Sequence, residues 1–274
     1  MNYPPTTLSA NDTLTIAQIS DLHLSGQPSC APSYQKFLHV LALAQRERPN
    51  LLLLTGDLVN DGDKRAYDWL FDTLARTNLA FACIAGNHDV TLEHHKHLPF
   101  ERRTFEPIAA DARLLDKHKI TITLAQGVWQ ILLLNSAVGG KIYGQLNADS
   151  LTWLQCHLRT QIPTIIAMHH HPTDVASAWI DAHCLQNKAE FWRIINDCPH
   201  VKAVLCGHVH QAHQLIAPTQ HQCTVYTCPS TDRQFMPHQD SFMLDNQLGG
   251  LRILRLNHHA IIAADTKRYD VCPK

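Results

Sequence analysis

Short apolar runs recur along the chain, separated by amphipathic stretches and turns. Leu51–Thr55 carries no charged residue and lies between Asn50 and Gly56, which is typical of a strand buried on both faces. In Lys64–Arg76, apolar residues recur every three or four positions, as on one face of a helix. These criteria predict strands at Leu14–Ser20, Leu51–Thr55, Ala80–Ala85, Ile120–Ala125, Val128–Asn135, Thr164–Met168, Val201–Leu205, Gln214–Ala217, Thr224–Thr227, Phe242–Leu244, Gly250–Leu256 and Ala260–Ala264.

Helical patterns lie between the strands, at Tyr34–Arg46, Lys64–Arg76, Asp149–Arg159 and Lys188–Ile195. The alternation predicts an α/β fold with two packed mixed β-sheets flanked by helices. Gln126-Gly127 predicts a hairpin between its flanking strands, and Asp61 is expected to cap the helix that follows it. In residues 91–118, charged residues and histidines interrupt the apolar pattern, so no element is predicted there. We predict a single domain over residues 1–274, with a β-rich part at 211–265.

Five of the predicted strands end in polar residues that can bind metal ions. They are followed by Asp21-x-His23, Asp57, Asn87-His88-Asp89, His169 and His208-x-His210. Because a strand delivers its last residue to one edge of a sheet, five strands together can gather these side chains around one point. Such a cluster is how a two-metal hydrolytic centre is built.

The residue types suit this chemistry. In extended backbone, residues i and i+2 point the same way, so Asp21 and His23 can reach one cation. The two carboxylate oxygens of Asp57 can bridge two metals, and Asn87 offers a ligand oxygen without a further negative charge. Glycines precede several of these positions and allow a sharp turn out of the strand.

Composition narrows the class of protein. The chain has 274 residues, 45% of them hydrophobic, with a formal net charge of −1. That balance argues against a dedicated nucleic-acid binder and gives no reason to expect membrane binding. Nine cysteines without CxxC spacing, and a start without signal-peptide character, indicate a reduced cytoplasmic protein rather than a disulfide framework. The chain has 20 histidines, and most of those outside the five clusters are expected to face solvent.

In this order, the five clusters resemble those of the calcineurin-like metallophosphoesterases, over residues 21–210. A closer resemblance is to the bacterial class III 3′,5′-cyclic-AMP phosphodiesterases. It is carried by the segments AMHHHP, SAWIDAHCLQN, PHVKAVLCGHVHQ, CPSTDRQFMPH and SFMLD. The stretch between His23 and Tyr34 is shorter than in that family. The resemblance implies a four-layer α-β-β-α sandwich.

The resemblance also implies two divalent metal ions per chain. One ion is held by Asp21, His23, Asp57 and His210, and the other by Asp57, Asn87, His169 and His208. The separation between His169 and His208 matches that of the family, so the resemblance selects His169 out of the run of three histidines and implies that His170 and His171 surround the site. Iron or manganese is the metal that the family implies, and zinc also suits mixed oxygen and nitrogen ligands.

The implied reaction is hydrolysis of 3′,5′-cyclic AMP to 5′-AMP by a hydroxide that bridges the two metals. His88 is the expected catalytic residue, which protonates the leaving oxygen or a phosphoryl oxygen. Asp89 either orients His88 or caps the turn. We expect the substrate to contact His23, Asp57, Asn87, His88 and His210.

The stretch after Asp57 contains no arginine, whereas protein phosphatases of this superfamily carry one there to clamp a dianionic monoester. The missing arginine favours a diester substrate. Other diesters remain open, including 2′,3′-cyclic nucleotides and glycerophosphodiesters. A nuclease has no support from charge, and a metal-free protein-binding scaffold would be expected to have lost ligands. The expected partner is a small-molecule cyclic nucleotide substrate, with no nucleic acid and no membrane, and the oligomeric state stays open.

Overall fold

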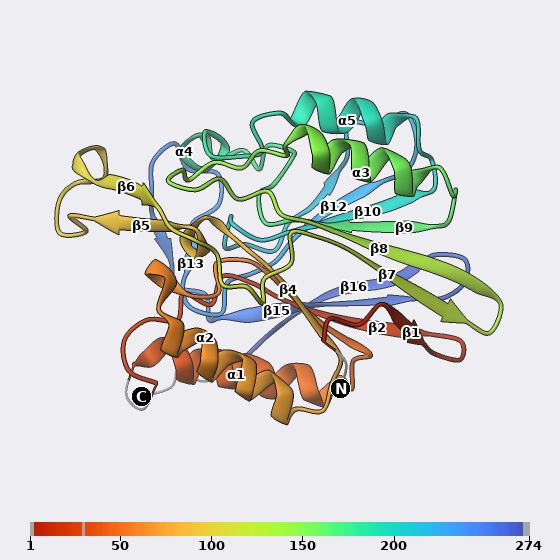
Figure 1. The fold of residues 1–274 in the computed structure, drawn as a ribbon, viewed down its shortest axis with the longest axis horizontal. Helices are drawn as coiled ribbons and strands as arrows, with labels where there is room; N and C mark the ends of the chain where they lie inside the picture. Colours follow the sequence, from red (N-terminus) through yellow and green to blue (C-terminus); the bar gives the residue numbers. More distant parts are fainter. Residues whose placement is uncertain (1–2, 29–30, 271–274) are drawn as a thin grey trace.

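The structure, a computed structural model, describes residues 3–28 and 31–270 and has two β-sheets packed face to face (Figure 1). The larger sheet has the order β1-β7-β8-β9-β10-β12-β11. Its strands are β1 (Thr7–Ser9), β7 (Lys117–Leu124), β8 (Gly127–Leu134), β9 (Thr164–Ala167), β10 (Val201–Cys206), β12 (Thr224–Thr227) and β11 (Gln214–Ile216). The smaller sheet has the order β16-β15-β2-β3-β4. Its strands are β16 (Ile261–Arg268), β15 (Gly250–Leu256), β2 (Leu14–Ile19), β3 (Leu51–Thr55) and β4 (Phe81–Ile84).

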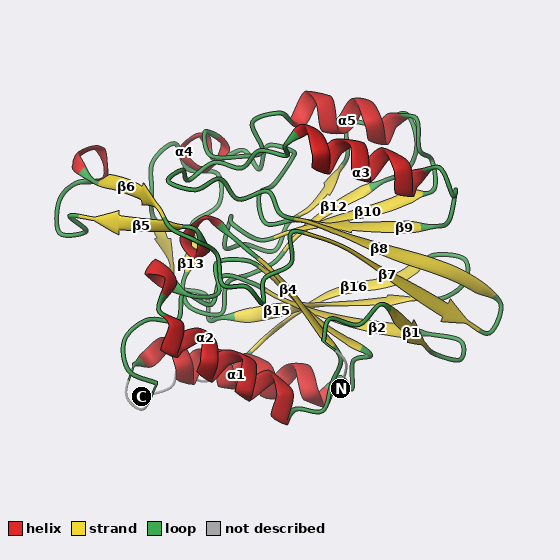
Figure 2. Cartoon of the chain, in the orientation of Figure 1, coloured by secondary structure: helices red, strands yellow, loops and turns green. Residues whose placement is uncertain are grey.

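Helices cover the outer face of each sheet, as the cartoon makes clear (Figure 2). The helices α1 (Pro32–Arg46) and α2 (Lys64–Arg76) share an apolar cluster with β2 and β3 of the smaller sheet. The helices α3 (Ala148–Leu158) and α5 (Lys188–Asn196) share another with β8, β9 and β10 of the larger sheet. The predicted four-layer α-β-β-α sandwich is therefore confirmed.

Strand β3 shows why a run of four leucines forms the centre of such a fold. Leu51 and Leu53 belong to the apolar cluster between the two sheets, whereas Leu52 and Leu54 belong to the cluster under α1 and α2. Side chains alternate between the two faces of a strand, and helices or sheet cover both faces here. All four leucines are therefore fully buried.

The strand directions bring the predicted site residues to one edge. Strands β2, β3 and β4 are parallel in the smaller sheet, as are β8, β9, β10 and β12 in the larger. A bridge between Ser20 and Ser230 joins the end of β2 to the segment after β12. The carboxyl ends of both parallel sets therefore meet, and the metal-binding clusters follow these ends.

Several expected boundaries differ from the structure. The hairpin turn is Ala125-Gln126, because Gly127 already pairs with Leu124 as the first residue of β8. A Cβ at Gly127 would lie 3.2 Å from the Cβ of His258, so this glycine serves a close approach rather than the turn. The strand expected at Phe242–Leu244 is instead β14 (Leu244–Asp245), which pairs with β13 (Gln234–Phe235).

Residues 91–118 form a projecting hairpin and the start of β7. The hairpin consists of β5 (Thr91–His94) and β6 (Thr104–Pro107), with the 3-10 turn η3 (Phe100–Arg102) between them. It lies at the same end of the molecule as β13 and the short helix α4 (Ala178–Asp181) (Figure 1). Two further 3-10 turns, η1 (Asn60–Gly62) and η2 (Asn87–Asp89), follow β3 and β4.

The seven cysteines within residues 3–28 and 31–270 are unpaired, and five of them are buried. Cys30 and Cys272 lie outside the described residues. None of the helices in the described residues is long and apolar enough to cross a membrane.

The cap of α2 is Asp63, and the expectation that Asp61 would cap this helix was wrong. The Asp63 carboxylate accepts a hydrogen bond of 3.0 Å from the Arg65 N–H. Asp61 has a φ of 60° inside η1, and its side chain pairs with Lys96 and accepts from the Glu93 N–H. The turn directs this carboxylate toward β5 instead of the helix start.

Replacing Asp63 with alanine is expected to lower the free energy of unfolding by about 1 kcal/mol, because it removes the cap. Urea unfolding followed by circular dichroism measures this change. Asp72→Ala on the same helix is the matched control, since the Asp72 carboxylate makes no hydrogen bond or ion pair within the described residues. Equal shifts for the two variants would contradict the capping role.

Candidate metal centre

The residues predicted to form the site lie together where β2, β3, β4, β9 and β10 end. Asp21, His23 and His210 offer ligand atoms within 4.8 Å of one another, and so do Asp21, Asp57 and His169. The same holds for His23, Asp57 and His88. His208 lies against His169, with ring centres 5.1 Å apart, and Asn87 precedes His88 in η2. Side chains from five strand ends therefore form one cluster.

Asp57 lies at the centre of this cluster. Its Oδ2 atom is 3.4 Å from His169 Nε2 and 3.8 Å from His23 Nε2. Its Oδ1 atom accepts a hydrogen bond of 2.8 Å from the backbone N–H of His88. One carboxylate thus touches histidines from both sheets and the turn that carries His88.

Asp21 makes similar contacts, with His210 and His208. Its Oδ1 atom is 3.4 Å from His210 Nε2, and its two oxygens accept from the His208 N–H at 3.1 and 3.2 Å. The Asp21 side chain has no exposed surface. It therefore ties the end of β2 to the loop after β10.

Several buried polar atoms in the cluster have no hydrogen-bond partner among the described residues: Asn87 Oδ1, His169 Nε2 and His208 Nε2. Two more ring nitrogens, His23 Nε2 and His210 Nε2, face each other at 3.1 Å. Buried polar atoms are rarely left unpaired in proteins. Lone pairs that converge without donors are satisfied by cations, so these residues fit a metal centre.

In three of the histidines, the Nδ1 atom, which points away from the cluster, lies within hydrogen-bond distance of an oxygen atom. His169 Nδ1 lies 2.7 Å from the Thr55 carbonyl, His210 Nδ1 2.8 Å from the Arg233 carbonyl, and His23 Nδ1 3.0 Å from Asn60 Oδ1. These oxygens accept an Nδ1–H, which leaves each Nε2 lone pair directed into the cluster. Metal-binding histidines usually have such a partner.

The other two histidines of the run differ from His169. His170 Nδ1 lies 2.9 Å from Ser136 Oγ and its Nε2 lies 2.9 Å from the Ile142 carbonyl. Although His170 is close enough to His169 and His208 to share a cation, both of its ring nitrogens are already engaged. His171 Nε2 lies 3.1 Å from the Asp181 carboxylate. Of these three histidines, all within the described residues, His169 is the one whose ring nitrogen pairs with Asp57.

The backbone around the cluster is strained. Five of the site residues adopt a left-handed φ: Asp21 (55°), His23 (47°), Asp57 (50°), His208 (70°) and His210 (50°). This region is disfavoured for residues with a Cβ, and residues held there gather at functional sites. The strand ends thus turn sharply to direct their side chains inward.

Gly86 is required by a close approach. A Cβ at this position would lie 2.2 Å from Asp57 Oδ1 and 2.3 Å from the Asp57 nitrogen. Any other residue would therefore displace the central carboxylate. Glycine, which has no Cβ, is the residue that permits this close backbone contact.

The Asp89 carboxylate supports the two turns that follow β3 and β4. It accepts backbone hydrogen bonds from Leu58, Val59 and Gly86 and one of 2.5 Å from the Tyr67 hydroxyl. Within the described residues, no hydrogen bond joins it to the His88 side chain. Burial, together with the charge of Asp57, raises the pKa of Asp89 to about 6. Of the two roles considered for Asp89, the geometry favours capping the turn.

The buried Asp57 carboxylate favours a positive charge on its neighbour His169. Burial would raise the pKa of Asp57, but His169 and His88 outweigh it and hold this pKa well below its usual range. Burial disfavours a charged His169, but the Asp57 carboxylate outweighs it and raises the pKa of His169 to about 9. Burial and the neighbouring His88 lower the pKa of His23 to about 4. A proton on His169 occupies the place that a cation would take.

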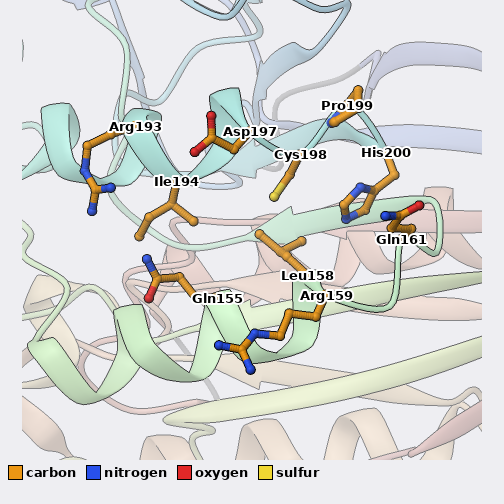
Figure 3. A pocket seen from close by; sticks show the side chains of 10 residues that line it. All are labelled: Gln155, Leu158, Arg159, Gln161, Arg193, Ile194, Asp197, Cys198, Pro199 and His200. Atoms are coloured by element: carbon orange, nitrogen blue, oxygen red, sulfur yellow. The ribbon is translucent and has the colours of Figure 1, made fainter.

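A pocket elsewhere lies at the opposite edge of the larger sheet (Figure 3). It is formed between the ends of α3 and α5 and includes Arg159, Arg193 and His200. These residues come before or between β9 and β10, whereas His169 and His208 follow those strands. The pocket is therefore separate from the metal-binding cluster.

Sequence reasoning missed the residues that hold the cluster in place. Asn60 and Tyr67 follow Asp57 along the chain, and Ser136 follows β8. Asn60 was within reach of a sequence argument because it lies just after a predicted ligand. Nothing local marks Tyr67 or Ser136, since their partners come from distant segments.

Known proteins with similar sequences and folds include several phosphoesterases. Residues 14–212 match the family model of the calcineurin-like phosphoesterases. A probable cyclic nucleotide phosphodiesterase of Moraxella catarrhalis is 48% identical over 258 residues, which cover 94% of this chain and 93% of that one. The 3′,5′-cyclic adenosine monophosphate phosphodiesterase CpdA of Escherichia coli is 31% identical, with 95% and 92% covered.

Among solved structures, a dimetal phosphatase from Danio rerio has a similar fold, with a TM-score of 0.59 and 15% identity over 95% of this chain and all of that one. This likeness concerns the fold alone. The family match covers most of the chain and includes every predicted ligand. The chain belongs to the calcineurin-like phosphoesterase family.

Proposed function

We propose that the protein hydrolyses 3′,5′-cyclic AMP to 5′-AMP at a centre of two divalent metal ions. The observation that carries this proposal is the convergence of unpaired oxygen and nitrogen atoms around Asp57. The names of the Moraxella and Escherichia relatives, which cover nearly the whole chain, support the substrate.

Asp57 belongs to both proposed ligand sets. The first ion would be held by Asp21, His23, Asp57 and His210, and the second by Asp57, Asn87, His169 and His208. The close approach of Asp21, His23 and His210 supports the first set. The unpaired Asn87 Oδ1, His169 Nε2 and His208 Nε2 atoms support the second. Iron or manganese is our proposal for both ions, and zinc would also suit these ligands.

When bound, the two cations would lower the pKa of the attacking water and neutralise charge on the phosphoryl oxygens. The chain itself orients the reactants, since the strained strand ends and the buried carbonyl partners hold the ligands in one arrangement. The reaction breaks the bond between phosphorus and O3′ as water oxygen bonds to phosphorus.

His88 is the proposed proton donor to O3′. Its backbone N–H is fixed to Asp57, and its ring lies 4.8 Å from that of His23 in an edge-on arrangement. The side chain is partly exposed, unlike the buried ligands, so it can meet the substrate. We propose that the substrate phosphate contacts His23, Asp57, Asn87, His88 and His210.

A diester fits this site better than a monoester. Residues 57–62 contain no arginine. Across residues 3–28 and 31–270, no lysine or arginine side chain pairs or hydrogen-bonds with any of the eight site residues. A diester carries a single negative charge at neutral pH and needs less positive charge than a dianionic monoester.

Metal-loaded protein is expected to convert 3′,5′-cyclic AMP to 5′-AMP, and a chelator should abolish the reaction. Parallel assays with 3′,5′-cyclic GMP and 2′,3′-cyclic AMP, with products separated by chromatography, measure the preference. Metal content is determined on the same samples. Hydrolysis of 2′,3′-cyclic AMP without any turnover of the 3′,5′ isomer would refute the proposed substrate.

A further inference from the structure

Three aromatic side chains, Trp179, Phe235 and Phe242, form a cluster beside His210. The Phe235 ring stacks on the His210 ring, with centres 3.9 Å apart and an angle of 8° between the planes. Trp179 meets Phe235 edge-on at 5.0 Å and Phe242 edge-on at 5.2 Å. Phe242 lies 5.4 Å from Phe235. We call these three residues the aromatic cluster.

The aromatic cluster is tied to the body of the protein at several points. The Gln211 side chain donates to the Phe235 carbonyl, and the Met236 N–H donates to the Met243 carbonyl at 2.8 Å. The Gln239 N–H reaches Ser177 Oγ at 3.4 Å, which links the loop before β14 to the start of α4. The ring positions are therefore set by the fold.

The apolar side chain of Phe242 is largely exposed to solvent. It is 55% exposed, and the neighbouring Met243 and Leu244 are 47% and 49% exposed. Scattered apolar residues on a surface are ordinary, whereas a contiguous exposed apolar patch marks an interaction site or a ligand-binding groove. Phe242 also has two aromatic neighbours that hold it while part of its surface faces solvent.

The aromatic cluster lies at a distance that suits a nucleotide. Its two ring contacts place Phe242 within about 10 Å of the His210 ring. A nucleotide whose phosphate is held near His210 carries its base at a comparable distance. Every base has a π-face that stacks on an aromatic side chain. Glycerol and other aliphatic diesters have no group that makes this contact.

We propose that the base of the nucleotide substrate stacks on Phe242, supported by Trp179 and Phe235. The aromatic cluster then selects nucleotides over other small phosphodiesters. This inference rests on the proposed function, because it takes the phosphate to bind at the metal centre. The competing use of the exposed patch is as a face that docks another protein.

Calorimetric titration of 5′-AMP and ribose 5-phosphate into metal-loaded protein tests the stacking. Both molecules carry the same phosphate and sugar, and only AMP has a base. AMP is expected to bind more tightly than ribose 5-phosphate. Phe242→Ala should weaken AMP binding about tenfold, as for the loss of one base–aromatic stack, and leave ribose 5-phosphate binding unchanged. Phe242→Trp should bind AMP as the wild type does.

The matched control is Ile262→Ala, which removes another exposed apolar side chain, 52% exposed, from β16. It should change neither titration. Equal binding of AMP and ribose 5-phosphate by the wild type would overturn the inference, as would unchanged AMP binding by Phe242→Ala. A changed oligomeric state of Phe242→Ala with normal AMP binding would assign the patch to protein docking and also overturn it.

The outcome is separable from that of the proposed function, since the titration requires no turnover. A wild type that prefers AMP over ribose 5-phosphate but leaves 3′,5′-cyclic AMP intact would refute the proposed reaction and retain the stacking surface. A wild type that hydrolyses cyclic AMP, with Phe242→Ala binding AMP normally, would refute the stacking surface alone.

Discussion

Asp57→Ala is expected to lower kcat/KM for cyclic AMP by about 10³-fold or more and to reduce the bound metal. Asp57 is the one residue proposed to hold both ions, and its carboxylate lies 3.4 Å from His169 Nε2. Metal ions contribute several kcal/mol to such a transition state, and each 1.4 kcal/mol corresponds to about tenfold in rate. Steady-state kinetics and elemental analysis of the same preparation measure both effects.

The control variant Asp57→Asn distinguishes the loss of the carboxylate charge from a loss of folding. Asp57→Asn keeps the size of the side chain and an oxygen that can accept from the His88 N–H. It should fold as the wild type does in circular dichroism and still lose most activity. Full activity of Asp57→Ala with two ions bound would rule out the two-metal centre.

His88→Ala is expected to lower kcat by about 10² to 10⁴ while the metal content stays at the wild-type level. The expected loss arises because His88 is proposed to protonate O3′, a poor leaving group without a proton. A diester that releases 4-nitrophenolate needs little protonation of its leaving oxygen. The loss with that substrate should therefore be much smaller than with cyclic AMP.

His97→Ala is the matched control for His88→Ala, since His97 is an exposed histidine on the hairpin of β5 and β6. It should leave both substrates unaffected. His88 also lies close enough to His23 and Asp57 to share a cation with them. Loss of metal from His88→Ala, or equal losses with the two leaving groups, would indicate a ligand instead of a proton donor.

The strands were predictable because their apolar patterns depend on local burial. The four leucines of β3 face two different apolar clusters, and a run without polar residues is what that position requires. The amphipathic pattern of α2 likewise reflects one buried face. The turn at Ala125-Gln126 and the cap at Asp63 were misplaced, because each depends on a shift of one or two residues.

The gathering of the site residues was predictable for a related reason. Parallel strands end at the same edge, so clusters that follow them are bound to meet. Tyr67 and Ser136 could not be predicted from the sequence, because their partners are Asp89 and His170 from other parts of the chain. The three residues of the aromatic cluster are likewise separated in sequence and meet only in the fold.

That five buried strands end in side chains able to bind cations can be read from the amino-acid sequence, since strand burial and ligand chemistry are local properties. Which atoms face one another depends on how distant segments pack together. His169 and His170 are adjacent and chemically identical, yet His169 Nδ1 is held by Thr55 and its Nε2 points at Asp57. Both nitrogens of His170 are engaged by Ser136 and Ile142. Other strands and loops contribute the atoms around each ring nitrogen, and these atoms decide whether the nitrogen is hydrogen-bonded or available to a cation.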